Sequence, residues 1–182
     1  MSTAVGLLKG YKLELHINES VKPVAQPVCR IPFRLPEKVD KKLNQLLELD
    51  IIEEVPDGLS GWILPLVVVP KGDGDIRMCM DMRRANKAII RERHPIPMVD
   101  GLLHDLNGST VFTNIDLKWG CHQILRSEDS RYITTFITHQ GLNGYKRLMV
   151  GVTSAPKKYQ QIVRDVLRSC PGVANIVDVQ EM

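Results

Sequence analysis

Apolar side chains recur at helical spacing in three parts of this 182-residue chain. In the first, Val39 and Leu43 begin a one-face pattern behind a proline, which predicts a helix from Pro36 to about Asp50. The same i, i+3, i+4 timing predicts helices from Pro97 to Leu106 and from Pro156 to Cys170. The chain therefore has helices in its first third, its middle and its last third.

Between these helices, apolar and polar residues alternate as they do in strands. Leu66–Val69 and Ile76–Arg83 flank the segment Pro70–Asp75, whose two glycines suit a tight turn, so a hairpin is predicted there. Further strands are predicted over Lys12–Ile17, Thr110–Leu117, Arg131–Thr138, Tyr145–Val150 and Val173–Val177, with Gln140–Gly144 as the turn between the third and the fourth of these.

The composition is that of an ordinary globular protein, with 43% hydrophobic and 25% charged residues. The longest apolar run, Trp62–Val69, contains Pro65 and is far shorter than the roughly 20 residues of a membrane-spanning helix. The N-terminus shows no secretory signal. We therefore expect no membrane segment and an intracellular protein, cytoplasmic or nuclear.

The net charge of +3 comes from one stretch. Between Lys71 and His94 lie seven basic and four acidic residues, and the rest of the chain is balanced. Such a local excess suits a phosphate-bearing partner, although on charge alone a solvated surface is the commoner outcome. The four cysteines have no zinc or redox spacing, so we expect reduced thiols, mostly in the core; they are Cys29, Cys79, Cys121 and Cys170.

Two aspartates stand where predicted strands end. If those strands are neighbours, the carboxylates of Asp116 and Asp178 converge and could hold Mg²⁺ together with substrate phosphates. An Asp that merely caps a turn is the commoner reading. Lys71 and Arg77 on the hairpin could reach a triphosphate, whereas Arg83 could bind phosphate or pair with Asp81.

Several segments, in this order, closely resemble the fingers and palm of reverse transcriptases from gypsy-like long-terminal-repeat retrotransposons. The resemblance runs from about Leu13 to Asp178, and its motifs are residues 69–86, 93–97, 112–124, 134–138 and 145–156. It implies an α+β fold in which helices back an antiparallel palm sheet. It further implies a connecting arm at 1–35, a fingers-like part at 36–95 and a palm-like part at 96–182 that stops before the thumb.

The resemblance also assigns roles to residues. Asp116 and Asp178 match the catalytic aspartates, which hold Mg²⁺, or Mn²⁺, together with the backbone carbonyl of Leu117. Lys71 and Arg77 match the residues that hold the incoming deoxynucleoside triphosphate. Nucleotide-contacting positions also include Cys121, Val150 and Gly151, and RNA or DNA template-primer would contact Arg83, Pro156 and Gln160, with Tyr159 beside the last of these.

The chain departs from the family pattern in four ways. Asp178 is followed by Val179 instead of a second aspartate, and Cys121 and Val150 each replace an aromatic residue. An aromatic at position 121 crowds a ribose 2′-hydroxyl. The sequence also stops at Met182, before the thumb and primer grip.

Two functions therefore compete at this point. The family activity is RNA-directed DNA polymerisation by two-metal nucleotidyl transfer, which we expect to be absent from this chain because positioning supplies most of the catalysis. The alternative is a degenerate, non-catalytic remnant that still binds nucleic acid. No sequence feature indicates a protein partner.

Overall fold

The computed structural model describes residues 5–32, 35–72, 74–91, 108–173 and 175. Within these residues, two α-helices and seven strands follow in the order β1 (Lys12–Leu13), α1 (Pro36–Glu48), β2 (Ile52–Glu54), β3 (Leu64–Pro70), β4 (Ile76–Met80), β5 (Leu125–Arg126), β6 (Thr135–Thr138), β7 (Gly141–Tyr145) and α3 (Ala155–Leu167). Short 3₁₀ turns lie at η1 (Ala85–Lys87), η2 (Gly120–Gln123), η3 (Glu128–Ser130) and η4 (Tyr132–Thr134).

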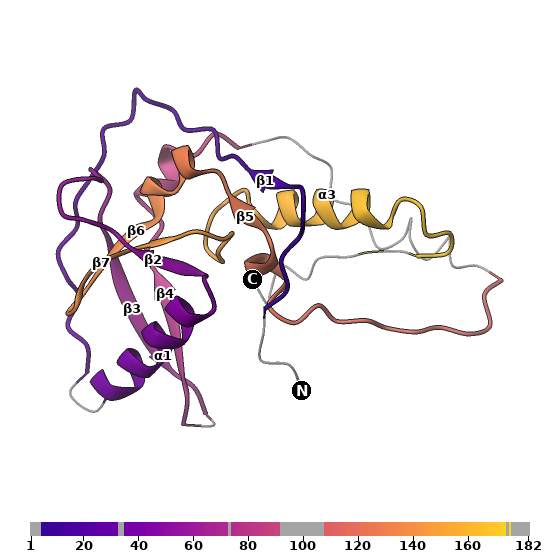
Figure 1. Ribbon diagram of the computed structural model, residues 1–182, viewed down its shortest axis with the longest axis horizontal. Coiled ribbons are helices and arrows are strands. Elements are labelled where there is room, and N and C mark those ends of the chain that lie inside the picture. The colour runs from indigo at the N-terminus through magenta and orange to yellow at the C-terminus, as the bar shows by residue number, and fades with distance from the viewer. Residues whose placement is uncertain (1–4, 33–34, 73, 92–107, 174, 176–182) are drawn as a thin grey trace.

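Five strands form one mixed sheet in the order β2-β7-β6-β3-β4. The β3–β6 pair is parallel, with Leu64 opposite Phe136, and the other three pairs are antiparallel. Figure 1 shows α1 lying against this sheet, while α3 and the 108–117 segment extend to one side of it. The sheet takes strands from both the 36–95 and the 96–182 ranges, so the two parts share it.

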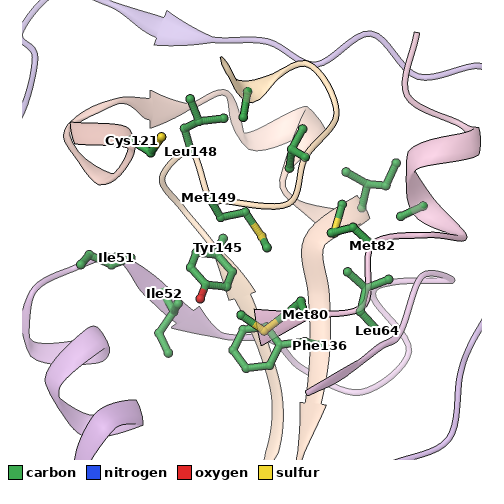
Figure 2. Close-up of a cluster of buried hydrophobic side chains, with 14 of the residues drawn as sticks. Ile51, Ile52, Leu64, Met80, Met82, Cys121, Phe136, Tyr145, Leu148 and Met149 are labelled. Carbon is green, nitrogen blue, oxygen red and sulfur yellow. The ribbon is translucent and has the colours of Figure 1, made fainter. Parts of the chain in front are cut away.

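The core lies between the sheet, α1 and the loop that leads to α3. The helix buries Val39, Leu43 and Leu46, the apolar stripe that its sequence spacing predicted. On the sheet, the rings of Phe136 and Tyr145 are 5.5 Å apart. Figure 2 shows Met80, Met82 and Met149 in the same cluster, so these methionines serve packing.

The N-terminal arm is built into the molecule by backbone pairing. β1 pairs with β5 in parallel, with Lys12 opposite Leu125. Farther along, the amide of Gln26 donates to the carbonyl of Ile63 at 2.9 Å. The arm therefore touches both the sheet and the segment that follows η2.

Several sequence predictions are confirmed. The helices that begin near Pro36 and Pro156 are present as α1 and α3, and the predicted hairpin is β3–β4. The helix Pro97–Leu106 and most of the strand Val173–Val177 lie outside the described residues. No helix of the described part of the chain is long and apolar enough to cross a membrane.

Other predictions are wrong. Thr110–Leu117 is an exposed segment without regular hydrogen bonding, not a strand. Gly141–Gly144 belongs to β7 rather than to a turn. Of the strand predicted for Lys12–Ile17, only Lys12–Leu13 is present, as β1. The cysteines are not mostly in the core either, since Cys29 and Cys170 are exposed, Cys79 is half-buried and Cys121 is buried.

Candidate active site

Asp116 lies at the edge of a pocket between the N-terminal arm and η2. Its side chain is exposed, and the pocket beside it has a volume of about 220 Å³. Val5 and Gly6 of the arm form one wall, and residues around η2 form the other; these are Leu117, Lys118, Trp119 and Gln123. An exposed carboxylate beside a small, partly polar pocket is suited to holding a charged ligand.

A tight turn fixes the chain directly after Asp116. The amide of Gly120 donates to the carbonyl of Leu117 at 3.1 Å, and the side chain of Gln123 donates to the carbonyl of Lys118 at 3.0 Å. Trp119 has φ of 59°, a left-handed conformation that is unfavourable for a bulky side chain. The turn therefore sets the direction in which the pocket wall faces.

The first turns of α3 bring Tyr159 against this segment. The ring of Tyr159 packs over Gly120 of η2. Burial, with Cys121 and Asp116 adding to it, raises the pKa of Tyr159. Cys121 is buried, and burial raises its pKa to about 11, so it is a neutral thiol. The structure thus brings Tyr159 of α3 against η2, the turn that contains Cys121 and closely follows Asp116.

The residues present at the pocket suit a hard divalent cation only in part. Asp116 offers a carboxylate and Leu117 a carbonyl whose second lone pair remains available, and Mg²⁺ prefers such oxygen ligands. Within the residues that the structure describes, no group of three or more His, Cys, Asp or Glu side chains gathers. Asp178 lies outside the described residues.

The β3–β4 hairpin presents a basic surface. Arg77 is exposed on β4, and Lys71 is exposed at the turn that its own amide closes by donating to the carbonyl of Asp75 at 2.8 Å. A backbone hydrogen bond from Ile76, helped by nearby lysines, holds the pKa of Asp75 below its usual value. Lys71 and Arg77 are therefore available to anions.

Arg83 is exposed but forms an ion pair with Asp81 of the same chain. Its Nε lies 2.9 Å from Oδ1 of Asp81, and its Nη2 lies 2.6 Å from Oδ2. The hydrogen bonds from Arg83 hold the pKa of Asp81 below its usual value. Of the two possibilities that the sequence left open, the ion pair with Asp81 is the one formed here.

Asn86 clamps the loop that contains Val150 and Gly151. Its side-chain nitrogen donates to the carbonyl of Gly151 at 2.8 Å, and its oxygen accepts from the amide of Thr153 at 3.0 Å. Gly151 has φ of 99°, which favours glycine, and Val150 is 41% exposed. Sequence reasoning missed Asn86, because a single Asn in a charged stretch carries no periodic signal.

The start of α3 is less exposed than the sequence led us to expect. Pro156 is half-buried in the first turn, and Gln160 is only 3% exposed. The Gln160 side chain donates to the carbonyl of Asn175 at 2.7 Å, and Asn175 donates back to the carbonyl of Gln160 at 3.3 Å. Gln160 therefore ties α3 to the segment that precedes Asp178 rather than facing outward.

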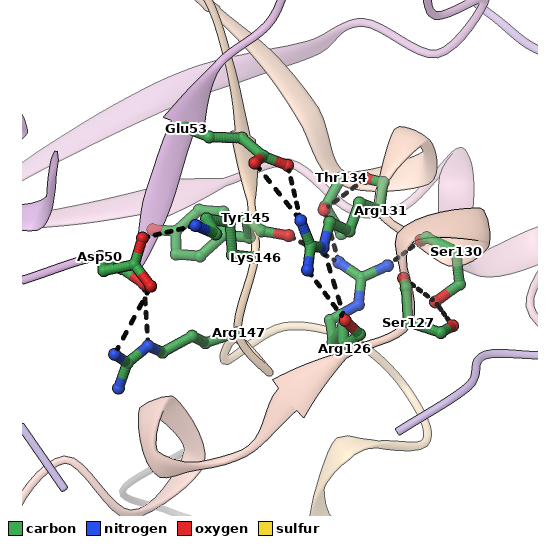
Figure 3. Close-up of polar contacts among 10 residues, drawn as sticks. All are labelled: Asp50, Glu53, Arg126, Ser127, Ser130, Arg131, Thr134, Tyr145, Lys146 and Arg147. Carbon is green, nitrogen blue, oxygen red and sulfur yellow. Dashed lines mark hydrogen bonds and ion pairs between the residues drawn. The ribbon is translucent and has the colours of Figure 1, made fainter. Parts of the chain in front are cut away.

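Two buried arginines were also missed, because charged residues carry no core signal in a hydropathy pattern. Arg126 donates to the hydroxyl of Thr134 at 2.6 Å and to the carbonyl of Ser130 (Figure 3), and burial lowers its pKa to about 9. Its neighbour Arg131 pairs with Glu53 at 3.2 Å. The second buried arginine, Arg147, belongs to a separate set of contacts, in which Asp50 meets both Arg147 and Lys146 (Figure 3).

Comparison with known proteins agrees with this geometry. Residues 69–179, more than half of the chain, match the family model "Reverse transcriptase (RNA-dependent DNA polymerase)". The chain is 33% identical over 93% of its length to the uncharacterized protein K02A2.6 of Caenorhabditis elegans, and 28% identical over 96% to the retrovirus-related Pol polyprotein from transposon opus of Drosophila melanogaster. It spans 13% and 18% of those relatives.

The fold is also that of solved reverse transcriptases. A crystal structure of Prototype Foamy Virus protease-reverse transcriptase superposes with a TM-score of 0.84 at 24% identity, over 97% of this chain and 23% of that one. A foamy viral protease-reverse transcriptase in complex with an RNA/DNA hybrid gives a TM-score of 0.80 over the same shares. The resemblance to retrotransposon reverse transcriptases, and the α+β fold of fingers and palm, are therefore confirmed. The chain belongs to the reverse transcriptase (RNA-dependent DNA polymerase) family.

Proposed function

We propose that this chain supplies the nucleotide-binding and template-binding part of an RNA-directed DNA polymerase. The observation that carries this proposal is the pocket beside the exposed carboxylate of Asp116, one wall of which is the segment around η2 over which Tyr159 packs. A nucleotide seated there would have its sugar near Cys121, where a side chain smaller than an aromatic leaves room for a 2′-hydroxyl.

Asp116 and the carbonyl of Leu117, together with Asp178, would hold Mg²⁺ or Mn²⁺. When bound, the metal supplies Lewis-acid stabilisation of charge on phosphoryl oxygens. The chain's own residues position the triphosphate. Lys71 acts as a point charge and Arg77 as a fork that matches two phosphate oxygens, and both are exposed on the hairpin.

Template-primer binding has its own support. The foamy viral enzymes with this fold were solved with double-stranded DNA and with an RNA/DNA hybrid. In this chain, the loop at Gly151 is held by Asn86 and leaves backbone exposed, so a nucleic-acid strand can approach it closely. We propose that the protein acts inside the cell, in the cytoplasm or nucleus. We also propose that residues 1–35 are a connecting arm, residues 36–95 a fingers-like part and residues 96–182 a palm-like part.

A second candidate function is nucleic-acid binding without catalysis. It is favoured by Val179, which stands where the family has a second aspartate and so lowers the negative charge available to balance two metal ions.

Primer extension distinguishes the two functions. A labelled primer on an RNA template is incubated with the chain, deoxynucleotides and Mg²⁺ or Mn²⁺, and binding of the same duplex is followed by fluorescence anisotropy. Extension that is lost in Asp116→Asn supports the polymerase. Binding that persists in Asp116→Asn without extension by either protein supports the non-catalytic function, and the absence of binding contradicts both.

A further inference from the structure

The side chain of Arg147 donates hydrogen bonds to backbone carbonyls in three separate segments. The side chain is 5% exposed. Its Nε donates to the carbonyl of Asp50 at 2.8 Å and its Nη2 to that of Leu49 at 3.2 Å, both at the end of α1. Its Nη1 donates to the carbonyls of His122 in η2 at 3.0 Å and Gly6 in the arm at 3.1 Å.

Only an arginine can make this set of contacts. The planar guanidinium presents five N–H donors in a fixed fork, whereas a lysine ammonium is a single point with three donors. One carboxylate, that of Asp50, lies near the charge of Arg147, at 4.0 Å from its Nη2. Lys146 contacts the same carboxylate (Figure 3). The remaining contacts are to neutral carbonyls.

The segments that Arg147 joins are the walls of the pocket beside Asp116. Gly6 forms part of the arm wall, and Trp119 forms part of the wall at η2. The backbone amide of Leu8 in the arm donates to the carbonyl of Gln123 in η2 at 2.8 Å, which ties the arm to η2. Lys42 of α1 lies over the Trp119 ring, 5.1 Å from its centroid, so α1 touches the same wall.

We propose that Arg147 is a positioning residue that sets the separation of the two pocket walls by holding the arm and η2 at the end of α1. It does not contact Asp116 itself. The expected effect of Arg147 on nucleotide transfer rests on the proposed function, whereas its structural role in joining the two pocket walls does not. The residue thus makes the N-terminal arm part of the candidate active site.

The test compares Arg147→Lys with Arg131→Lys, which alters an arginine paired with Glu53 and away from the pocket. Hydrogen exchange of the Leu8 amide should become roughly tenfold faster in Arg147→Lys, because loss of one or two hydrogen bonds changes local opening by about that factor. The Gln26 amide, held in the same arm by Ile63, should not change. Arg131→Lys should leave both amides as they are.

Two further readouts report on the pocket. Quenching of Trp119 fluorescence by acrylamide should rise in Arg147→Lys; Trp62 is 1% exposed and contributes little to the change. If the chain extends primers, Arg147→Lys should raise KM for the nucleotide by about tenfold and change kcat less, since it alters positioning rather than the reacting groups.

Equal acceleration at Leu8 and Gln26, or unchanged Trp119 quenching, would overturn the proposal. If the unaltered chain neither binds nor extends a primer, the proposed function fails, and the Leu8 and Trp119 measurements still decide the role of Arg147. If the Arg147→Lys protein does not unfold cooperatively, the test uses native-state hydrogen exchange of the unaltered protein instead of the variant. The Nε proton of Arg147 and the Leu8 amide must then open with the same free energy, and different values would refute the proposal.

Discussion

The ring of Tyr159 lies so close over Gly120 that a Cβ atom at position 120 would be 2.7 Å from Cζ of the tyrosine, inside van der Waals contact. The absence of a side chain at this one position allows α3 to approach η2. Tyr159 packs for that reason against the η2 turn, which contains Cys121 and closely follows Asp116.

Gly120→Ala should therefore destabilise the fold by about 1–3 kcal/mol, the usual cost of overpacking, as measured by urea unfolding. Gly72→Ala is the matched control, because a Cβ at Gly72 meets nothing within 4 Å. Adding Tyr159→Leu to Gly120→Ala should recover part of the loss. Equal effects of the two alanines would contradict the packing argument.

Asn86→Ala should loosen the loop that follows Val150. The change removes two hydrogen bonds, to Gly151 and from Thr153, and should cost about 1–3 kcal/mol. Hydrogen exchange at the Thr153 amide should accelerate, and template-primer binding should weaken. Asn18→Ala, which affects only contacts with Ser20, should do neither. An unchanged Thr153 amide would show that the clamp is unimportant.

Stability should fall as the pH drops from about 6.5 to about 4. Burial, with Arg147 and Lys42 nearby, lowers the pKa of His122 to about 4 in the folded state, so only the unfolded chain takes up a proton in this window. The loss should be on the order of 2–3 kcal/mol, since one pKa unit is worth about 1.4 kcal/mol. His122→Phe should flatten the curve of unfolding free energy against pH over that range. The same slope in both proteins would exclude His122 as its cause.

The cysteines should react at very different rates with iodoacetamide at mildly alkaline pH. Cys29 and Cys170 are exposed and should be alkylated first, whereas burial and the raised pKa should protect Cys121. Peptide mass spectrometry over time measures this order, and all four should react alike in denaturant. Early labelling of Cys121 in the native protein would contradict its buried position.

Template-primer binding should weaken with salt, and Arg77→Ala should lower the slope by about one counterion. Arg83→Ala should have a smaller effect, because Arg83 is held by Asp81. Asp81→Asn should strengthen binding at low salt by releasing Arg83. Anisotropy titrations across a salt series measure all three. Equal losses for Arg77→Ala and Arg83→Ala would mean that the ion pair does not compete with phosphate.

The elements that sequence predicted best are those in which spacing and local turn chemistry agree. α1 and α3 combine an apolar stripe with a proline in the first turn, and the β3–β4 hairpin combines alternation with a glycine-rich turn. The resemblance placed Asp116 and Cys121 at one site, which stays a prediction; the structure packs Tyr159 against the turn that contains Cys121.

β7 was misread because its glycines and asparagine serve tertiary packing. Asn143 is buried opposite Phe136, and Gly144 leaves room for Val55, whose Cγ2 would lie 3.0 Å from a Cβ there. Long-range pairing outweighs local preference in such strands. Arg147 was missed for a related reason, since its partners are backbone carbonyls that no sequence pattern reveals.

The parallel pairing of β1 with β5 also bears on how the molecule folds. Lys12 pairs with Leu125, far along the chain, so closing this contact costs about 2–3 kcal/mol more chain entropy than forming the β3–β4 hairpin. During synthesis, the arm leaves the ribosome before the residues around η2 do, so it cannot dock until they follow. The candidate active site, whose one wall is that arm, is consequently expected to form later than the β3–β4 hairpin.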